Sequence, residues 1–570
     1  MSDGGYNRLV PFSRVPLLVV LCGLTFIVGL GRPAITDSDE AFYAEAAREM
    51  QERDDWITPH YNGEVRFEKP ILYYWLAAGA ASLSLDAELA ARLPSALAGL
   101  VLVLTTFVAA RRWYDLPTAG LAGAITGTSF GYIAAGRQAL PDLALACFIT
   151  LATYAALVVL VCPSGPVVTR QRWGWLSLAG AALAAGFLTK GPVALVLPAL
   201  VVGPLALWRA RSAGTWAAWW QLIKEVGWLA AVWLLLSVPW FAAMSDTHGV
   251  AYLDRFFMAE NLERFATARY NNPRPLWYYV PIVVGGLLPW SPLMALWARP
   301  ALRILARARR VAAVEGWLLL WAATPLLFYS LSIGKQPRYV LPILPPLAIL
   351  LARAIARSLP KRADAGADRT LAAAGVGSGL IIAGLGLLVY RARPLLVGVD
   401  PSMVIAGTAT LILAGGGVAL AAVARQRCLP LSLAAASVVA TLSIHYIVLS
   451  RPGPEPVEEM ATLIQSVEGG GLPYGRYRMF VRNLVFYMER PHVDVSSIEQ
   501  VATFLSASEH VLCVVEESDL VRAGVPAFEI GRVSYLNTGS LTLDTLIWPD
   551  PETDLQTVLL VSNRPSILEN

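Results

Sequence analysis

Residues 141–161 read PDLALACFITLATYAALVVLV, an apolar run whose charged residue, Asp142, stands at its start. A helix needs ~20 such residues to cross the hydrocarbon core of a membrane. Similar runs recur along the chain from Val15 to Leu449. The whole chain is 56% hydrophobic and 15% charged, whereas soluble domains carry roughly 25% charged residues. The sequence therefore predicts a polytopic α-helical membrane protein.

Hydropathy over windows of ~19 residues predicts about 13 transmembrane helices within residues 1–449. They cover 15–30, 89–110, 117–136, 141–161, 173–189, 191–208, 226–245, 276–298, 313–331, 337–357, 370–390, 402–423 and 430–449. The short run 70–85 would reverse the side of every later loop if it crossed the membrane. When it does not cross, the arginine-rich loops 111–112, 170–172, 299–310 and 425–427 share one side with Arg8 and Arg14, as the positive-inside rule requires.

Residues 37–88 thus form a loop on the opposite, external side, with two helices predicted to lie at the membrane interface. One is the run 70–85, and the other spans 37–53. The second is amphipathic: Phe42, Tyr43, Ala46 and Met50 share one face, and Glu45, Arg48, Glu49 and Glu52 share the other. Such a pattern is typical of a helix in the interface plane.

Residues 450–570 are more polar and follow a linker with Pro452, Pro454 and Pro456. Strands are predicted at 478–481, 510–515, 533–536 and 557–561, and helices at 456–466 and 497–505. This pattern indicates a soluble α/β domain. The five cysteines, Cys22, Cys147, Cys162, Cys428 and Cys513, show neither a disulfide framework nor metal-ligand spacing, and we interpret them as buried small hydrophobic residues. No basic stripe with interleaved aromatic residues suggests nucleic acid.

Two acids on the external side are candidates for chemistry. Asp37 followed by Glu40 resembles a capping box, so helix-start chemistry explains both residues. Asp39 is not explained in this way. Asp142 could be an ordinary acid in the first turn of a helix. Because Asp39 and Asp142 are both predicted on the face that also carries several cations, we consider them catalytic candidates.

Those cations are Lys69, Lys190, Lys335 and Arg338, in loops that otherwise contain few basic residues. A long basic side chain at the end of a span often extends to the interface, which accounts for any one of them. Four on the same face favour an anionic ligand, such as the phosphate of a lipid carrier. His248 could join Glu68 at a divalent cation, although a lone histidine is more typical of a hydrogen-bonding residue.

Several motifs resemble a known family. They are Asp39-Glu40 with YAEAAREM, DW-x-x-P, NGEVRFEKP-x-x-YYW, LTKGP, FF-x-x-ENLERF, WYY, LPW, and K-x-x-x-Y-x-LP-x-x-P starting at Lys335. Together they are similar to the bacterial aminoarabinose transferases, which are GT-C type glycosyltransferases that use polyisoprenyl phosphate donors and are related to protein O-mannosyltransferases. Tyr270 stands where some relatives are expected to carry a polar or basic residue, so the acceptor site can differ.

The resemblance implies transfer of 4-amino-4-deoxy-L-arabinose from undecaprenyl phosphate to lipid A phosphates, at the periplasmic face of the inner membrane. Residues 1–449 would be the transferase domain, residues 37–88 a periplasmic loop, and residues 450–570 a periplasmic domain. We expect a monomer that gives resistance to polymyxin and cationic peptides. Candidate substrate-binding residues are Glu40, Tyr43, Glu68, Tyr329 and Tyr339, and candidate phosphate-binding residues are Lys69, Lys190, Lys335 and Arg338.

Two alternatives stay open at this point. A related transferase would act on protein hydroxyls or another glycolipid, and Asp39 would then be the natural base. A transporter of lipid-linked sugars would place its ionisable residues near the bilayer midplane, whereas the charges here gather at one interface.

Overall fold

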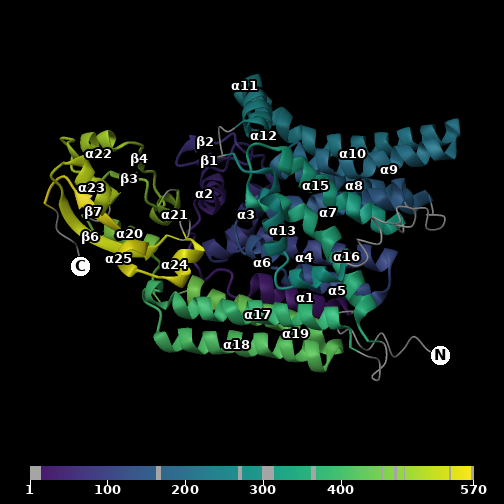
Figure 1. Ribbon diagram of the computed structural model, residues 1–570. Coiled ribbons are helices and arrows are strands. Elements are labelled where there is room, and N and C mark those ends of the chain that lie inside the picture. Colours follow the sequence, from purple (N-terminus) through teal and green to yellow (C-terminus); the bar gives the residue numbers. More distant parts are fainter. Residues whose placement is uncertain are drawn as a thin grey trace.

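The computed structural model describes residues 14–161, 169–267, 273–297, 313–360, 367–450, 453–467, 471–480, 482–537 and 541–565. Arg8, Cys162, Tyr270 and the arginines between 299 and 310 lie outside these ranges. Within them, a large helical part is followed by a smaller α/β part, which lies beside one end of the helices (Figure 1).

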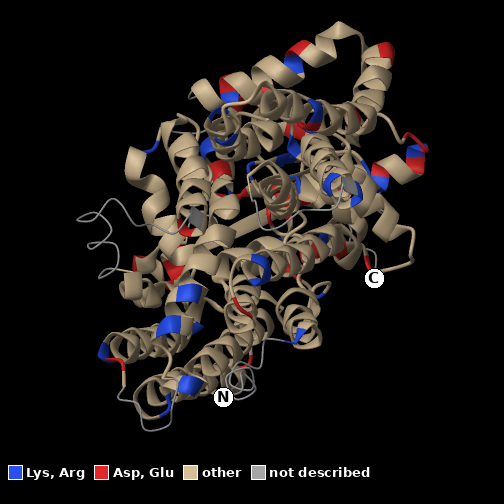
Figure 2. Cartoon of the chain, turned by 90° about the vertical axis from the view of Figure 1, so that its right-hand side faces the viewer, with Lys and Arg blue, Asp and Glu red and all other residues tan. Residues whose placement is uncertain are grey.

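Nine helical segments of the described residues are long and apolar enough to cross a membrane. They are α4 (Ala87–Trp113), α7 (Pro141–Leu160), α9 (Val193–Ala213), α10 (Trp216–His248), α15 (Ala313–Leu331), η6 with α16 (Pro337–Ile343, Leu344–Ser358), α17 (Arg369–Arg391), α18 (Pro401–Ala424), and η8, α19 and η9 in sequence (Gln426–Cys428, Leu429–Ile444, His445–Leu449). Long stretches of the helices carry no charged residue (Figure 2). The chain is a multi-pass membrane protein.

Other predicted spans are helical but short, interrupted or less apolar. These elements are α1 (Val15–Cys22) with η2 (Gly23–Ile27), α5 (Leu116–Thr128) with α6 (Phe130–Gly136), α8 (Thr169–Lys190), and η4 (Leu276–Tyr278) with α13 (Tyr279–Gly286) and η5 (Ser291–Met294). Helices Leu276–Gly286 and Ser291–Trp297 meet at 114°, and counting them as one span brings the total to ten. The expected number of about 13 stays a prediction.

Helix α7 lies at the centre of the membrane part. In its apolar window, 89% of the residues are buried, and it packs against α4, α8 and α9. Pro141 occupies the first turn, where a missing backbone N–H loses no helical hydrogen bond. Asp142 follows it and is therefore carried into a buried position at the external end of the bundle.

The external loop after η2 forms α2 (Ser38–Arg53), a two-stranded ribbon of β1 (His60–Tyr61) and β2 (Glu64–Val65), and α3 (Leu72–Ala81). The Asp37 carboxylate accepts hydrogen bonds from the backbone N–H groups of Asp39 and Glu40, so the predicted helix start is confirmed. Helix α3 has 10 residues, which is about 15 Å and too short to cross a membrane.

The polar face expected for α2 is not fully solvated. Glu45 and Glu49 are buried, since α2 packs between α3 and the C-terminal part of the chain. Burial raises the pKa of Glu45 to about 7, although the hydrogen bond and charge of Arg48 lower it. Amphipathic spacing alone could not distinguish a helix covered by another domain from one covered by water.

A buried ion pair fixes the start of this loop to the bundle. Arg92 of α4 donates to both carboxylate oxygens of Glu40, at 2.7 and 3.0 Å, and to the backbone carbonyls of Leu30 and Ala34. Glu40 also accepts from the backbone N–H of Ala139, at 2.7 Å. The two side chains are 4% exposed, so neither charge is compensated by water.

Arg92→Met is expected to destabilise the protein by about 3 to 5 kcal/mol, because it leaves the Glu40 carboxylate buried without its cation. The measurement is thermal unfolding of the detergent-solubilised protein. Arg111→Gln is the control, since Arg111 is an exposed arginine near the other end of the same helix. Equal stability of the two variants would mean that the Arg92 pair does not anchor the loop.

The loop between α10 and η4 is helical in its first half, in α11 (Val250–Asp254), the π-helix η3 (Arg255–Glu263) and α12 (Arg264–Ala266). The short helix η7 (Arg393–Leu395) lies in another connection, between α17 and α18.

The C-terminal domain has a five-stranded sheet in the order β4-β3-β5-β7-β6. The strands are β3 (Tyr474–Tyr477), β4 (Val493–Val495), β5 (Leu512–Glu516), β6 (Phe528–Leu536) and β7 (Leu555–Ser562); the helices are α20 (Pro456–Gln465), α21 (Asn483–Met488), α22 (Ile498–Leu505), α23 (Glu517–Ala523), α24 (Leu543–Ile547) and α25 (Pro551–Asp554). Strand β3 is parallel to β4 and β5, and β7 is antiparallel to β5 and β6.

Three of the four predicted strands are confirmed as β5, β6 and β7. The strand predicted at 478–481 is wrong: Arg478 and Phe480 have φ values of 60° and 45°, and the strand ends at Tyr477. Strands β3 and β4 were not predicted. Cys428 is exposed, contrary to the expectation, whereas Cys22, Cys147 and Cys513 are buried.

Candidate functional site

Asp39 lies in the first turn of α2, where two arginines hold its carboxylate. Arg338 of η6 contacts Oδ2 at 2.7 Å, and Arg482 of the C-terminal domain contacts Oδ1 at 3.0 Å. Burial raises the pKa of Asp39, but the hydrogen bond from Arg338 and the charges of both arginines lower it below its usual value. The carboxylate is therefore ionised at neutral pH.

Asp142 is joined to Asp39 through the same arginine. Its Oδ1 lies 2.5 Å from Lys190 Nζ, and its Oδ2 lies 3.9 Å from Arg338 Nε. Positive and negative side chains thus alternate along one line, in the order Lys190, Asp142, Arg338, Asp39 and Arg482. Each acid has a cation on both sides, which suits acids that keep their charge during a reaction.

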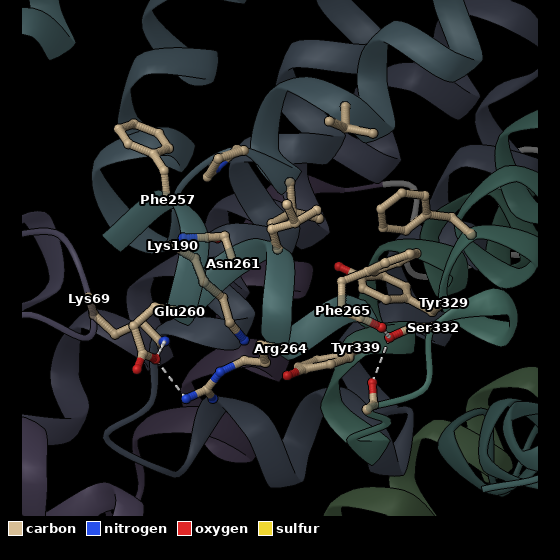
Figure 3. Close-up of a pocket in the computed structure, with 16 residues that line it drawn as sticks. Lys69, Lys190, Phe257, Glu260, Asn261, Arg264, Phe265, Tyr329, Ser332 and Tyr339 are labelled. Carbon is tan, nitrogen blue, oxygen red and sulfur yellow. Dashed lines mark hydrogen bonds and ion pairs between the residues drawn. The ribbon is translucent and has the colours of Figure 1, made fainter. Parts of the chain in front are cut away.

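A cavity of about 420 Å³ begins where Lys190 ends this line. Figure 3 shows Lys69, Glu260 and Arg264 facing one another on one side of it, with Tyr329, Ser332 and Tyr339 on the other. The rest of the wall is largely apolar, and includes Val193, Val196, Phe257, Leu262, Phe265 and Phe328. Cations beside an apolar wall fit a ligand with an anionic head and a hydrocarbon tail.

Lys69 lines this cavity with its side chain 11% exposed, and its Nζ lies 3.9 Å from Glu260 Oε2. The same carboxylate oxygen accepts a hydrogen bond from Arg264, at 2.8 Å. Burial lowers the pKa of Lys69 to about 7, and the charge of Arg264 acts in the same direction, while Glu260 opposes it. An anion near Lys69 would stabilise its ammonium form and raise this pKa.

Lys190 is positioned by a tight turn between α8 and α9. The next residue, Gly191, has φ +95°, which side-chain-bearing residues rarely adopt, and its N–H donates to the Phe187 carbonyl at 2.8 Å. A Cβ on Gly191 would lie 2.8 Å from the ring of Phe256. The turn therefore requires glycine, and it directs Lys190 towards Asp142.

Gly191→Ala is expected to lower stability by at least about 1 to 2 kcal/mol, because alanine is strained at this φ. Gly203→Ala is the matched control: it lies in α9, and a Cβ there meets no heavy atom within 4 Å. The measurement is thermal unfolding, and a Gly191 variant as stable as the Gly203 variant would contradict this role for the turn.

The structure brings together Asp39, Asp142, Lys69, Lys190, Arg338, Tyr329 and Tyr339, and it places other predicted site residues elsewhere. Glu40 is occupied by Arg92, so we remove it from the substrate-binding candidates. Tyr43 is buried between Tyr73 and Tyr74 and does not line the cavity. Lys335 donates to the backbone carbonyl of Ser332 and does not line the cavity either. Sequence position predicted the external side for these residues, but not their partners.

The predicted metal ligands have other partners. Glu68 is 3.4 Å from Arg66 and 3.8 Å from Arg255, and the ring of His248 shares a hydrogen bond of 2.8 Å with the Thr58 hydroxyl. Among the described residues, no group of three or more His, Cys, Asp and Glu side chains could hold a metal ion. This geometry does not support a cation bound by Glu68 and His248.

Three site residues were missing from the predicted set. Glu260 and Arg264 belong to the ENLERF motif, and that motif was the signal that could have identified them. Arg482 lies in the C-terminal domain, 443 residues from Asp39, and nothing in its local sequence indicates the contact.

The chain is similar to known proteins in both sequence and structure. Residues 34–246 match the family model described as dolichyl-phosphate-mannose-protein mannosyltransferase. Undecaprenyl phosphate-alpha-4-amino-4-deoxy-L-arabinose arabinosyl transferase 2 of Pseudomonas fluorescens is 34% identical over 342 residues, which are 60% of this chain and 56% of that protein. Transferase 1 of the same organism is 35% identical over 379 residues, 66% of this chain and 64% of that protein. The matched region is thus less than two thirds of either relative.

Two solved structures share the fold over nearly the whole chain. The crystal structure of ArnT from Cupriavidus metallidurans bound to undecaprenyl phosphate has a TM-score of 0.73 at 23% identity, and it covers 98% of this chain and 99% of that one. The apo structure has a TM-score of 0.70 at 22% identity, with 96% and 98% covered. The predicted GT-C fold and the predicted resemblance to aminoarabinose transferases are confirmed.

Proposed function

Given this resemblance, we propose that the protein transfers 4-amino-4-deoxy-L-arabinose from undecaprenyl phosphate to phosphate groups of lipid A. The cavity carries this proposal. It combines Lys69, Lys190 and Arg264 with an apolar wall, as a polyisoprenyl phosphate requires. It also opens next to two acids that are each paired with cations.

The chemistry needs little acid or base catalysis. The bond from the sugar C1 to the donor phosphate oxygen breaks, and its electron pair leaves with undecaprenyl phosphate. A bond from C1 to an acceptor phosphate oxygen forms. Both phosphates are weak bases and already anionic, so cations that stabilise the leaving phosphate matter more than a proton donor. Lys69 and Lys190, which line the cavity, would supply this charge.

Asp39 and Asp142 would then act through their charge. Glycosyl transfer passes through a transition state with positive charge on the sugar ring. An ionised carboxylate nearby stabilises that charge, and it also orients the ammonium group of the aminosugar. A site with two such carboxylates beside a cationic cavity suits this donor better than a neutral sugar.

We further propose that the site faces the periplasm from the inner membrane and that the protein acts as a monomer. The first external loop and the C-terminal domain would then both be periplasmic. Attachment of the cationic sugar reduces the negative charge of lipid A, so cells that express the protein would resist polymyxin and cationic peptides better than cells without it.

The test is a transfer assay with purified protein, labelled aminoarabinose lipid donor and two acceptors. One acceptor is lipid A, and the other is a peptide rich in Ser and Thr; products are identified by mass spectrometry. Modified lipid A supports the proposal. Modified peptide alone would favour the alternative that resembles the mannosyltransferases. Movement of intact donor across a vesicle membrane, with neither product, would indicate a transporter.

A further inference from the structure

The C-terminal domain holds the external loop through several specific contacts. Asn483 donates to the carbonyls of Ile35 and Thr36, at 3.0 and 2.5 Å, immediately before the helix that carries Asp39. Further along the loop, Asn62 exchanges two hydrogen bonds with the backbone of His492. The domain is therefore fixed on both sides of α2, which also lies between the bundle and the domain in Figure 1.

Arg482 reaches the site from this contact. It stands at the start of α21 with φ +75°, a conformation that costs a non-glycine residue about 1 kcal/mol or more. Its guanidinium stacks on the Phe42 ring, 3.8 Å from the centroid, and donates to Asp39 Oδ1 at 3.0 Å. Its carbonyl accepts from the Tyr61 hydroxyl at 3.4 Å. Both ends of Arg482 are thus held against the external loop.

The two arginines divide the Asp39 carboxylate between them. Arg338 binds one oxygen and Arg482 binds the other, so the plane of the carboxylate is fixed only while both are present. Arg338 is also shared with Asp142, whose Oδ2 lies 3.9 Å from its Nε, so Arg482 is the cation that contacts Asp39 without also contacting Asp142. We infer that Arg482 is a positioning residue for Asp39, and that the C-terminal domain thereby completes the active site.

The surrounding charges determine what loss of Arg482 would do. Asp39 faces Arg338 of η6, Asp142 of α7, Arg66 after β2, Arg482, and Asp37 at the start of its own helix. The negative charges of Asp37 and Asp142 oppose ionisation of Asp39. Removing Arg482 takes away one of the cations that offset them. The pKa of Asp39 would rise, and a reaction that needs its carboxylate would be lost at a higher pH on the acid side.

The experiment compares Arg482→Gln, Arg482→Lys and Arg478→Gln in the full-length protein. Arg478 is an exposed arginine of the same segment whose guanidinium lies over Tyr477, so it is the control for loss of charge. For Arg482→Gln we expect kcat to fall about 10- to 100-fold with an unchanged KM for the donor, because only Asp39 is misplaced. The pH at which its activity falls on the acid side should be higher than in the wild type. Arg482→Lys keeps the charge, so it should retain the wild-type acid limb and recover part of kcat.

Other outcomes overturn the inference. They are an unchanged kcat and acid limb in Arg482→Gln, an equal effect of Arg478→Gln, or an acid limb in Arg482→Lys that moves as far as in Arg482→Gln. The kinetic test rests on the proposed function. A second test does not: carbodiimide labelling of the Asp39 carboxyl is measured as a function of pH. If the wild type transfers no aminoarabinose, the proposed function fails, while labelling still shows whether loss of Arg482 raises the pH at which Asp39 reacts. Identical labelling curves would then reject the inference on their own.

Discussion

Lys69→Ala is expected to weaken binding of undecaprenyl phosphate about 30- to 100-fold, which corresponds to about 2 to 3 kcal/mol. Lys69 is a cation that lines the cavity, and its removal leaves the phosphate to Lys190 and Arg264. The substitution leaves Asp39 and Asp142 in place, so any loss of transfer should result from weaker donor binding. Binding can be measured by isothermal titration in detergent.

The dependence on pH identifies Lys69 more specifically than affinity does. Without a ligand its pKa is about 7, so the side chain is charged below that pH and largely neutral above it. A bound phosphate raises the pKa, and the protein must therefore take up a proton when it binds the ligand above pH 7. Wild-type affinity should fall by up to about tenfold per pH unit in this range, relative to the Lys69→Ala variant. Titration of the ligand itself cancels in that comparison.

Lys224→Ala provides the control for the loss of one lysine, since Lys224 is exposed on α10 and does not line the cavity. It should bind undecaprenyl phosphate like the wild type at every pH. An affinity and a pH dependence of Lys69→Ala that match the wild type would exclude Lys69 from the phosphate site.

The helices and the gathering of these charges at the ends of helices were predictable, because both follow from where the apolar runs begin and end. A membrane span needs a long apolar run, and Asp142 at the start of such a run must lie near the membrane surface. The motif around Lys69 and Lys190 added the class of ligand. Those predictions need only residues that are close together in the sequence.

The partners of the charged residues were not predictable, because they depend on packing between distant segments. Glu40 and Asp39 are neighbours in one helical turn, yet Glu40 faces Arg92 in the bundle and Asp39 faces Arg338 and Arg482. Glu45 illustrates the same limit: it is buried in the folded protein, and its helix packs against α21, which is more than 400 residues away in sequence. Composition and periodicity do not contain this information.

Asp39→Asn is expected to reduce the rate of transfer about 100- to 1,000-fold while leaving donor binding nearly unchanged. The substitution keeps the size of the side chain but removes the negative charge that would stabilise the sugar in the transition state. The cavity residues that hold the phosphate are not altered. A fall in kcat with a constant KM is therefore the expected signature.

Asp37→Asn is the matched control, two residues earlier in the chain. Asp37 starts the same helix by accepting the N–H groups of Asp39 and Glu40, and asparagine caps helices about as well as aspartate. This variant should fold and transfer like the wild type. A similar loss in both variants would point to damage to the helix start instead of a role for the Asp39 charge.

The pH profile of the wild type separates the two roles open to Asp39. Arg338 and Arg482 hold its pKa below the usual value for aspartate, so a charge-stabilising Asp39 stays ionised in neutral and mildly acidic solution. A general base for a hydroxyl acceptor works best with a pKa near the working pH, which this environment opposes. A phosphate acceptor would be favoured if wild-type transfer is constant from pH 7 down to about 5 and Asp39→Asn has lost transfer throughout that range. Wild-type turnover in Asp39→Asn would remove the residue from the site.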